Sequence, residues 1–146
     1  MKNSKKVAII IPAYNEQDRL PGTLDALAKF IVDQNDNFDY QVNIVNDGST
    51  DDTVNLITQT LKELPIVSKI TNLPTNKGKG YAVKHAITQL QDFDYYYLAD
   101  ADLSAEWQTL SDFLAIAEDE KIDCVIASRA LPESNVKTSL LRNCLL

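Results

Sequence analysis

Residues 7–16 read Val-Ala-Ile-Ile-Ile-Pro-Ala-Tyr-Asn-Glu, and this stretch decides the fold of the 146-residue chain. Residues 7–11 are apolar at every position instead of at alternate positions, which is typical of a strand that helices cover on both faces. A second run of the same kind lies at residues 42–45. The sequence therefore predicts a buried sheet whose strands are mainly parallel.

Further strand candidates lie at residues 66–70, 95–98 and 124–127, and segments with helical spacing separate all these runs. The apolar helix positions are Leu20, Leu24, Leu27 and Ile31; Val54, Ile57, Leu61 and Leu64; Val83, Ala86, Ile87 and Leu90; Trp107, Leu110, Leu114 and Ala117. Strands that alternate with amphipathic helices form right-handed crossovers. We therefore predict one α/β domain with a doubly wound, mainly parallel sheet.

Composition and charge exclude several classes of protein. Fourteen basic and twenty-one acidic residues give a formal net charge of −7, which opposes a nucleic-acid partner. No apolar stretch approaches the ~18 residues of a transmembrane segment. Cys124 and Cys144 form no paired motif, so a reducing, cytoplasmic compartment is the simpler interpretation. We interpret Cys124 as a small buried hydrophobic residue.

Clusters of polar residues follow the predicted strands, at residues 12–16, 46–52, 76–80, 100–102 and 128–129. Ligands of an open α/β sheet bind outside the carboxyl ends of its strands, where loops and helix amino termini converge. The clusters are scattered over more than a hundred positions, yet each belongs to this one edge. They therefore predict a single binding site.

The first two clusters offer groups that suit a nucleoside. Tyr14 provides a ring for stacking, and the Glu16 carboxylate can accept hydrogen bonds from ribose hydroxyls. Asp47 can accept a base N–H, and Gly48 allows close approach. The competing interpretation is structural, since Glu16 favours a helix amino terminus and residues 50–52 can cap the next helix. Capping does not explain Asp47.

The third cluster is a basic loop with two glycines ahead of a helix, so its backbone N–H groups and Lys79 can face a phosphate. An ordinary turn with solvated lysines is the alternative. Val83 stands where a dinucleotide fingerprint needs its third glycine, and the loop is no Walker motif.

Asp100 and Asp102 are two positions apart after an apolar run, so both carboxylates can point the same way. Carboxylate oxygens suit Mg²⁺ or Mn²⁺, with substrate phosphates as further ligands. The alternative is an acidic turn that caps the next helix through Ser104, which is weaker here because other polar clusters accompany the pair. Arg129 offers a bidentate fork to a diphosphate, or else forms a surface ion pair.

In this order and spacing, the clusters resemble the inverting family-two glycosyltransferases with the GT-A fold, from residue 7 to about residue 142. The last two clusters are similar to the branch that glucosylates or mannosylates polyprenyl (dolichyl) phosphate. The resemblance implies these site residues: Pro12, Ala13, Tyr14, Glu16, Asp47, Gly48, Lys79, Asp100, Ala101, Asp102 and Arg129.

The resemblance also implies their roles. The residues of the first cluster hold the base and ribose, Asp47 takes the base N–H, and Lys79 faces the phosphates. Asp100 serves the ribose side and the metal, Asp102 binds the metal, and Arg129 neutralises the diphosphate. Asp102 and Arg129 are the residues expected to act in catalysis, because negative charge develops on the leaving diphosphate.

The implied donor is a UDP-sugar, with UDP-glucose favoured, or GDP-mannose, and the implied acceptor is a polyprenyl phosphate. This acceptor is already an anion and needs no strong general base, and no candidate base stands out in the sequence. Two alternatives stay open. One is a nucleotide-sugar-binding domain without independent activity, and the other is a sugar-1-phosphate nucleotidyltransferase, which normally has a glycine-rich loop after its first strand.

The family normally continues beyond the last cluster into acceptor-binding elements. We therefore expect residues 1–146 to form a nucleotide-sugar-binding glycosyltransferase domain that lacks most of the acceptor-binding part and has little or no transferase activity alone. The expected location is the cytoplasm or the cytoplasmic face of a membrane. A homodimer or peripheral membrane association stays open, through apolar residues at Leu140, Leu141, Leu145 and Leu146.

Overall fold

Strand β1 (Lys5–Ala13) forms the interior of a parallel four-stranded sheet, as its continuous apolar run predicts. It pairs with β2 (Phe38–Asn46) on one side and with β4 (Tyr95–Leu98) on the other. Strand β3 (Val67–Asn72) pairs with β2, which gives the order β3-β2-β1-β4. The computed structural model describes residues 4–34, 38–102, 107–120 and 122–127.

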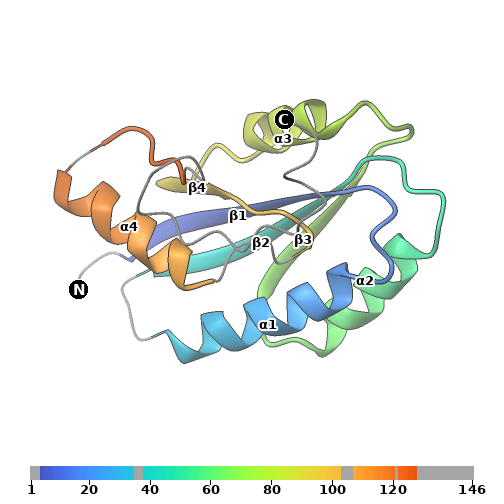
Figure 1. Ribbon diagram of the computed structural model, residues 1–146, viewed down its shortest axis with the longest axis horizontal. Helices are drawn as coiled ribbons and strands as arrows, with labels where there is room; N and C mark the ends of the chain where they lie inside the picture. The colour runs from blue at the N-terminus through green and yellow to red at the C-terminus, as the bar shows by residue number, and fades with distance from the viewer. Residues whose placement is uncertain (1–3, 35–37, 103–106, 121, 128–146) are drawn as a thin grey trace, which may run out of the picture. The chain divides into compact units, whose positions relative to one another are not determined.

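The sheet carries helices on both faces, as Figure 1 shows. Helices α1 (Leu20–Asp33) and α2 (Thr53–Glu63) lie on one face and contact each other. Helix α3 (Lys79–Gln89) lies on the other face, against β1 and β2. This arrangement confirms the predicted doubly wound α/β architecture.

The core divides between the two faces of β1 because successive strand residues point to opposite sides. Toward α3, a buried cluster is formed by Ala8, Ile10, Val45, Leu73, Ala82, Ala86 and Leu90. The alternate residues of β1 serve the other face, and the leucines of α1 that were predicted as its buried stripe, Leu20, Leu24 and Leu27, are fully buried. Each fully buried leucine or isoleucine contributes about 1.5–3 kcal/mol to folding.

Two predictions need correction, namely the boundaries of the first two strands and the set of buried residues in α3. The β1–β2 ladder extends from the Lys5–Phe38 pair to the Ala13–Asn46 pair, well beyond the predicted runs, because backbone pairing continues past the apolar residues. In α3, Ile87 is 43% exposed and Ala82 is buried instead. Alanines four positions apart, Ala82 and Ala86, face the sheet because their small side chains let the helix approach it closely.

The fifth predicted strand is wrong. Residues 122–127 contain no strand, Ile126 is 80% exposed, and Cys124 is exposed instead of buried. A short apolar run is compatible with a strand, but its periodicity alone does not distinguish a strand from another apolar segment.

Backbone contacts divide the chain into two units, Met1–Thr109 and Leu110–Leu146. The first unit holds the sheet and helices α1 to α3, and all contacts described below belong to it. Helix α4 (Gln108–Glu120) lies mostly in the second unit. None of the four helices among the described residues combines the length and apolar character that crossing a membrane requires.

Candidate functional site

The loops after β1, β2 and β4, together with the loop before α3, meet at the carboxyl ends of the strands, which we call the rim. Asp47 N donates to Ala13 O at 2.8 Å, so the chain leaves β2 beside the end of β1. Ala99 N donates to Ile10 O at 3.0 Å, which keeps the chain after β4 beside β1 as well. The strand order reverses between β1 and β4, and such switch points are where α/β sheets bind ligands.

Asp47 holds the loop before α3 in place. Its side chain is buried, and Oδ1 accepts from Lys77 N at 2.9 Å while Oδ2 accepts from Gly78 N at 2.7 Å. A carboxylate that accepts from backbone N–H groups makes strong, charge-assisted bonds. Each carboxylate oxygen keeps a second lone pair, so the predicted base contact stays a prediction.

Gly48 has a positive φ of 70° and lies against the same loop. A Cβ at this position would be 2.6 Å from Thr75 C and 2.7 Å from Asn76 N, both backbone atoms. Only glycine fits such a conformation and such a gap. The close approach predicted for Gly48 is thus already made by the chain's own loop.

The loops after β1 and β2 are joined by reciprocal hydrogen bonds, which we call the loop lattice (residues 15–17 and 49–53). Asn15 N donates to Ser49 Oγ at 3.0 Å, and Thr50 N donates to Asn15 Oδ1 at 2.9 Å. Glu16 N donates to Thr53 Oγ1 at 2.8 Å. Asn15 has a φ of 54°, a left-handed conformation that asparagine tolerates better than most residues.

The second half of the loop lattice corrects the capping interpretation of residues 50–52. Asp52 N donates to Gln17 Oε1 at 3.0 Å, and the Asp52 side chain accepts from Asn55 instead of capping the backbone of α2. Asp51 accepts from Thr53 N at 3.1 Å, as a cap does, but also from Gln17 N at 3.4 Å. These residues therefore connect two loops as well as starting a helix.

The pKa of Asp51 reflects this environment. Burial acts to raise the pKa, but hydrogen bonds from Thr53 Oγ1, Thr53 N and Gln17 N outweigh it and lower the pKa below its ordinary value of 3.8. The loop lattice therefore favours the ionised carboxylate.

The residues of the first cluster differ in what they offer to a ligand. Tyr14 is 43% exposed, so its ring is accessible, whereas the Ala13 side chain is buried and Pro12 is half-buried. Glu16 is paired with Arg19, whose Nε lies 2.7 Å from Oε2 and whose Nη2 lies 2.9 Å from Oε1. A ribose would therefore meet a carboxylate that is already oriented by an arginine.

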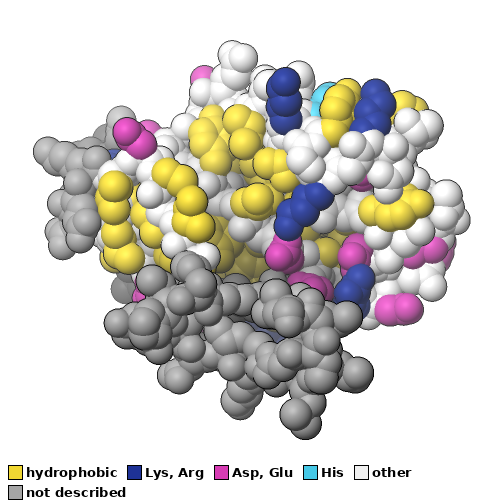
Figure 2. Space-filling view, turned by 45° about the horizontal axis from the view of Figure 1, so that its top comes forward, with side chains coloured by type: hydrophobic (Ala, Val, Ile, Leu, Met, Phe, Trp, Pro, Cys, Tyr) yellow, Lys and Arg dark blue, Asp and Glu magenta, His cyan; other side chains and the backbone are white. Residues whose placement is uncertain are grey.

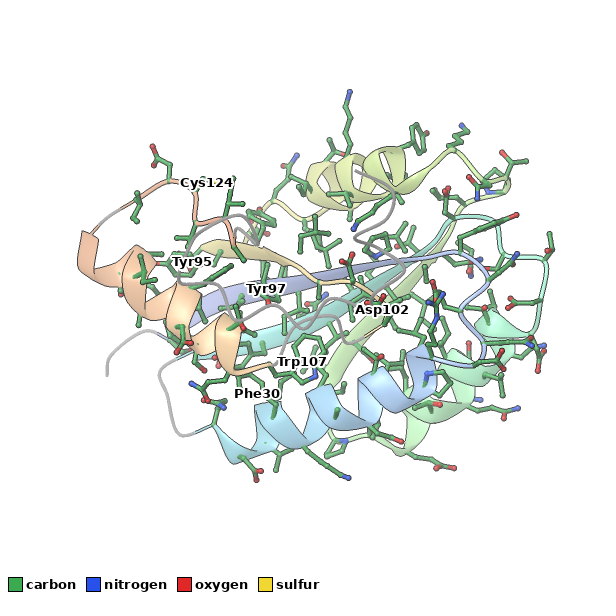
Figure 3. All side chains as sticks on the ribbon, viewed as in Figure 1. Phe30, Tyr95, Tyr97, Asp102, Trp107 and Cys124 are labelled. Carbon is green, nitrogen blue, oxygen red and sulfur yellow. The ribbon has the colours of Figure 1, made fainter. Side chains whose placement is uncertain are left out.

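Asp100 and Asp102, the acidic pair, lie at the carboxyl end of β4, where Figure 3 labels Asp102. Both are exposed and flank Ala101, which is buried. Thr23 Oγ1 in α1 donates to Ala101 O at 2.7 Å, a bond that fixes the backbone between the two carboxylates. Burial and the charge of Asp100 raise the pKa of Tyr97 in β4.

Lys79 and Asp100, predicted from separate clusters, form an ion pair. Lys79 is the first residue of α3, where helix N–H groups without intrahelical partners favour anions. Figure 2 shows basic side chains lying directly against acidic ones on the face drawn there, in keeping with this pair and with Arg19–Glu16. The structure thus brings Asp47, Lys79 and Asp100 to one rim.

The acidic pair fits a divalent cation of the Mg²⁺ or Mn²⁺ type. The Lys79 ammonium group lies against Asp100, in the place that a metal cation would take, so this carboxylate attracts positive charge. Within the described ranges, no group of three or more His, Cys, Asp or Glu side chains could hold a metal. Mg²⁺ commonly binds one or two carboxylates and takes further ligands from water and substrate phosphates. The pair therefore suits a cation that arrives with a phosphate ligand.

The last predicted site residue, Arg129, lies outside the described residues, as does Ser128. The rim, the loop lattice and the acidic pair lie where open α/β domains bind their ligands. The sequence profile of "Glycosyl transferase family 2" matches residues 8–143, and the chain belongs to this family. The resemblance stated from the polar clusters is confirmed.

Individual relatives agree with the family. The chain is 35% identical over 150 residues to a dolichyl-phosphate beta-glucosyltransferase of Dictyostelium discoideum, covering 96% of this chain and 46% of that protein. It is 25% identical to S. aureus TarS in complex with UDP-GlcNAc, with a TM-score of 0.65 and coverage of 91% and 38%.

The fold is also similar to mannosyltransferase PcManGT from Pyrobaculum calidifontis, solved with GDP-Man and Mn²⁺. That match has 24% identity, a TM-score of 0.65 and coverage of 85% and 36%. These neighbours confirm the predicted GT-A fold. The chain spans less than half the length of each of these three relatives.

Proposed function

We propose that this chain is the donor-binding part of an inverting glycosyltransferase that binds a nucleoside-diphosphate sugar with Mg²⁺ or Mn²⁺ and transfers the sugar to a polyprenyl phosphate. The observation that carries the proposal is the rim, where Asp47 fixes the loop before α3 and Lys79 meets Asp100. A cation-binding carboxylate and a phosphate-binding helix terminus lie next to each other there. A nucleoside diphosphate with its metal requires both.

The nucleoside end of the donor belongs to the loops after β1 and β2. We assign Tyr14 to the base or ribose by stacking, and Glu16 to the ribose hydroxyls. Asp47 accepts the base N–H with its remaining lone pairs. Pro12 and Ala13 contribute through backbone and shape, since the Ala13 side chain is buried.

The diphosphate end belongs to α3 and the acidic pair. The amino terminus of α3 and Lys79 face the phosphates. Asp102, with Asp100, would hold the cation, which when bound stabilises negative charge on the leaving diphosphate. Arg129 is assigned to the same charge as a bidentate partner. The role of this chain is to hold the diphosphate beside fixed N–H groups before the sugar is displaced, so that these groups stabilise the negative charge as it develops.

A polyprenyl phosphate acceptor and transfer of glucose are supported by the Dictyostelium discoideum relative, which is named for dolichyl phosphate and glucosyl transfer. UDP as the nucleotide is supported by S. aureus TarS, which was solved with UDP-GlcNAc. An anionic acceptor attacks without a strong general base, so the proposal assigns this role to none of the rim carboxylates. GDP-mannose is the second donor to be tested. We propose the cytoplasm or the cytoplasmic face of a membrane as the location, where the protein would meet a lipid acceptor.

Isothermal titration calorimetry of the 146-residue chain tests donor binding. We expect UDP-glucose to bind with Mn²⁺ present and to bind at least about tenfold more weakly without it, since the acidic pair needs a cation to meet a diphosphate. UMP, which lacks the second phosphate, is the ligand control, and GDP-mannose tests the base. The proposal fails if neither nucleotide sugar binds with Mn²⁺.

A domain that binds the donor without turning it over is the second candidate, because the chain spans less than half of its relatives. Incubation with UDP-glucose, Mn²⁺ and dolichyl phosphate should then release little or no UDP. Rapid glucosyl transfer would instead show that the acceptor site is complete within these residues. Family membership disfavours the remaining alternative, a sugar-1-phosphate nucleotidyltransferase.

A further inference from the structure

We propose that Lys79 is a built-in counter-ion of the site. Its ammonium group neutralises Asp100, as the ion pair shows, and would move to the diphosphate when the cation and the donor bind. Cation and donor binding would then be coupled through one side chain. This inference rests on the proposed function and names a regulatory step at the same site.

The backbone of Lys79 is fixed, whereas its ammonium group is accessible. Asp47 holds the two preceding backbone N–H groups, and Gly78 with a φ of 90° turns the chain into α3. The Lys79 side chain is 56% exposed and that of Asp100 is 47% exposed. A long side chain on a fixed backbone can therefore change partner without a movement of the loop.

Electrostatics favour the exchange. A solvent-exposed ion pair gains little net free energy, so its loss is easily compensated. A divalent cation on the acidic pair would repel an ammonium group at the same oxygen atoms. The phosphates that accompany the cation would lie at the amino terminus of α3, where Lys79 begins. Lys79 thus leaves one anion and finds another within reach of its own side chain.

The other basic side chains described around the rim have different partners. Lys77 Nζ lies 4.6 Å from the centre of the Tyr81 ring and donates to its hydroxyl at 3.4 Å. Arg19 is paired with Glu16. Lys79 differs from these two side chains in that it forms an ion pair with Asp100.

The test is Mn²⁺ affinity without nucleotide, measured for the 146-residue chain by electron paramagnetic resonance of free Mn²⁺. We expect Lys79→Gln to bind Mn²⁺ about two- to fivefold more tightly than wild type, because the competing ammonium is gone. Lys84→Gln is the matched control, since it removes the same charge from an exposed position five residues further along α3. It should change Mn²⁺ affinity less.

The same variant should bind the donor more weakly. With saturating Mn²⁺, we expect Lys79→Gln to lose about tenfold in UDP-glucose affinity by calorimetry, because a charge-assisted contact to phosphate is removed. Lys79→Arg keeps the charge and should retain most of the affinity. Opposite changes for metal and donor are the signature of an exchanging counter-ion, which a purely structural lysine would not produce.

The outcomes separate the two proposals. If wild type binds no nucleotide sugar, the proposed function fails, and the Mn²⁺ titration still tests the Lys79–Asp100 pair. If Lys79→Gln and Lys84→Gln bind Mn²⁺ equally, the counter-ion is refuted while donor binding stands. In an Asp100→Asn background, the Lys79→Gln effect on Mn²⁺ should disappear. Its persistence would also refute the inference.

Discussion

The two halves of the rim are held together in different ways. At the half that is proposed to bind the nucleoside, the loop lattice joins residues 15–17 to residues 49–53 through backbone N–H groups that donate in both directions. At the other half, which is proposed to face the diphosphate, the contact that the structure describes between α3 and the chain after β4 is the exposed ion pair between Lys79 and Asp100. We infer that the nucleoside half is preorganised, which lowers the entropic cost of binding, and that the diphosphate half adapts to its ligand.

The largest effect should come from Gly48→Ala, because Gly48 in the loop after β2 packs against the loop before α3. The new Cβ would lie 2.6 Å from Thr75 C at a φ of 70°. Strain and overpacking together should lower the free energy of unfolding by about 3 kcal/mol, as measured by urea denaturation.

Gly80→Ala is the matched control for this prediction. Its Cβ would meet nothing within 4 Å, and alanine suits the first turn of α3. We expect no loss, or a gain of up to about 1 kcal/mol. Equal destabilisation by both substitutions would show that Gly48 has no special contact with the loop.

A smaller effect is expected when one bond of the loop lattice is removed. Asn15→Gly keeps the positive φ but loses the acceptor for Thr50 N, which should cost about 1 kcal/mol of unfolding free energy. Lys79→Gln, in the other half, should cost no more than about 0.5 kcal/mol, since it breaks only an exposed ion pair. The reverse order in urea denaturation would contradict the comparison.

The smallest effect concerns the stability of the folded chain at low pH. The pKa of Asp51 is lower in the folded chain than its ordinary value of 3.8, so its contribution is complete above that value. It is lost as the pH falls below 3.8 and through the lowered pKa. Between about pH 6 and about pH 3, wild type should therefore lose more stability than Asp51→Asn, which cannot titrate. Parallel losses in the two proteins would mean that the loop lattice does not favour the ionised form.

The sequence predicted the sheet because its decisive information is local. Continuous apolar runs mark β1 and β2, and the switch-point rule then places the polar clusters at one edge. Runs of marginal character are less informative, because pairing depends on the neighbours. Residues 95–98 form β4, whereas residues 124–127 lie outside any strand.

The contacts within the site were less predictable for a related reason. Thr23 lies inside α1, and nothing in its local pattern indicates a bond to Ala101, 78 positions away. Helix capping already explained residues 51 and 52, so nothing in the sequence indicated their hydrogen bonds with Gln17. The ion pair between Lys79 and Asp100 is different, because opposite charges that are predicted at the same edge of a sheet are expected to attract each other.

The buried hydrogen bond from Thr23 to Ala101 connects α1 to the backbone between Asp100 and Asp102. At its amino end, α1 grows out of the loop that carries Glu16, whose carbonyl accepts from Leu20 N at 3.0 Å. One turn later, Thr23 donates to the carbonyl of Ala101 and so fixes the position of the acidic pair. Any substitution that bends this first turn would therefore move the loop after β1 and the acidic pair together, so a single helical turn sets the distance between them.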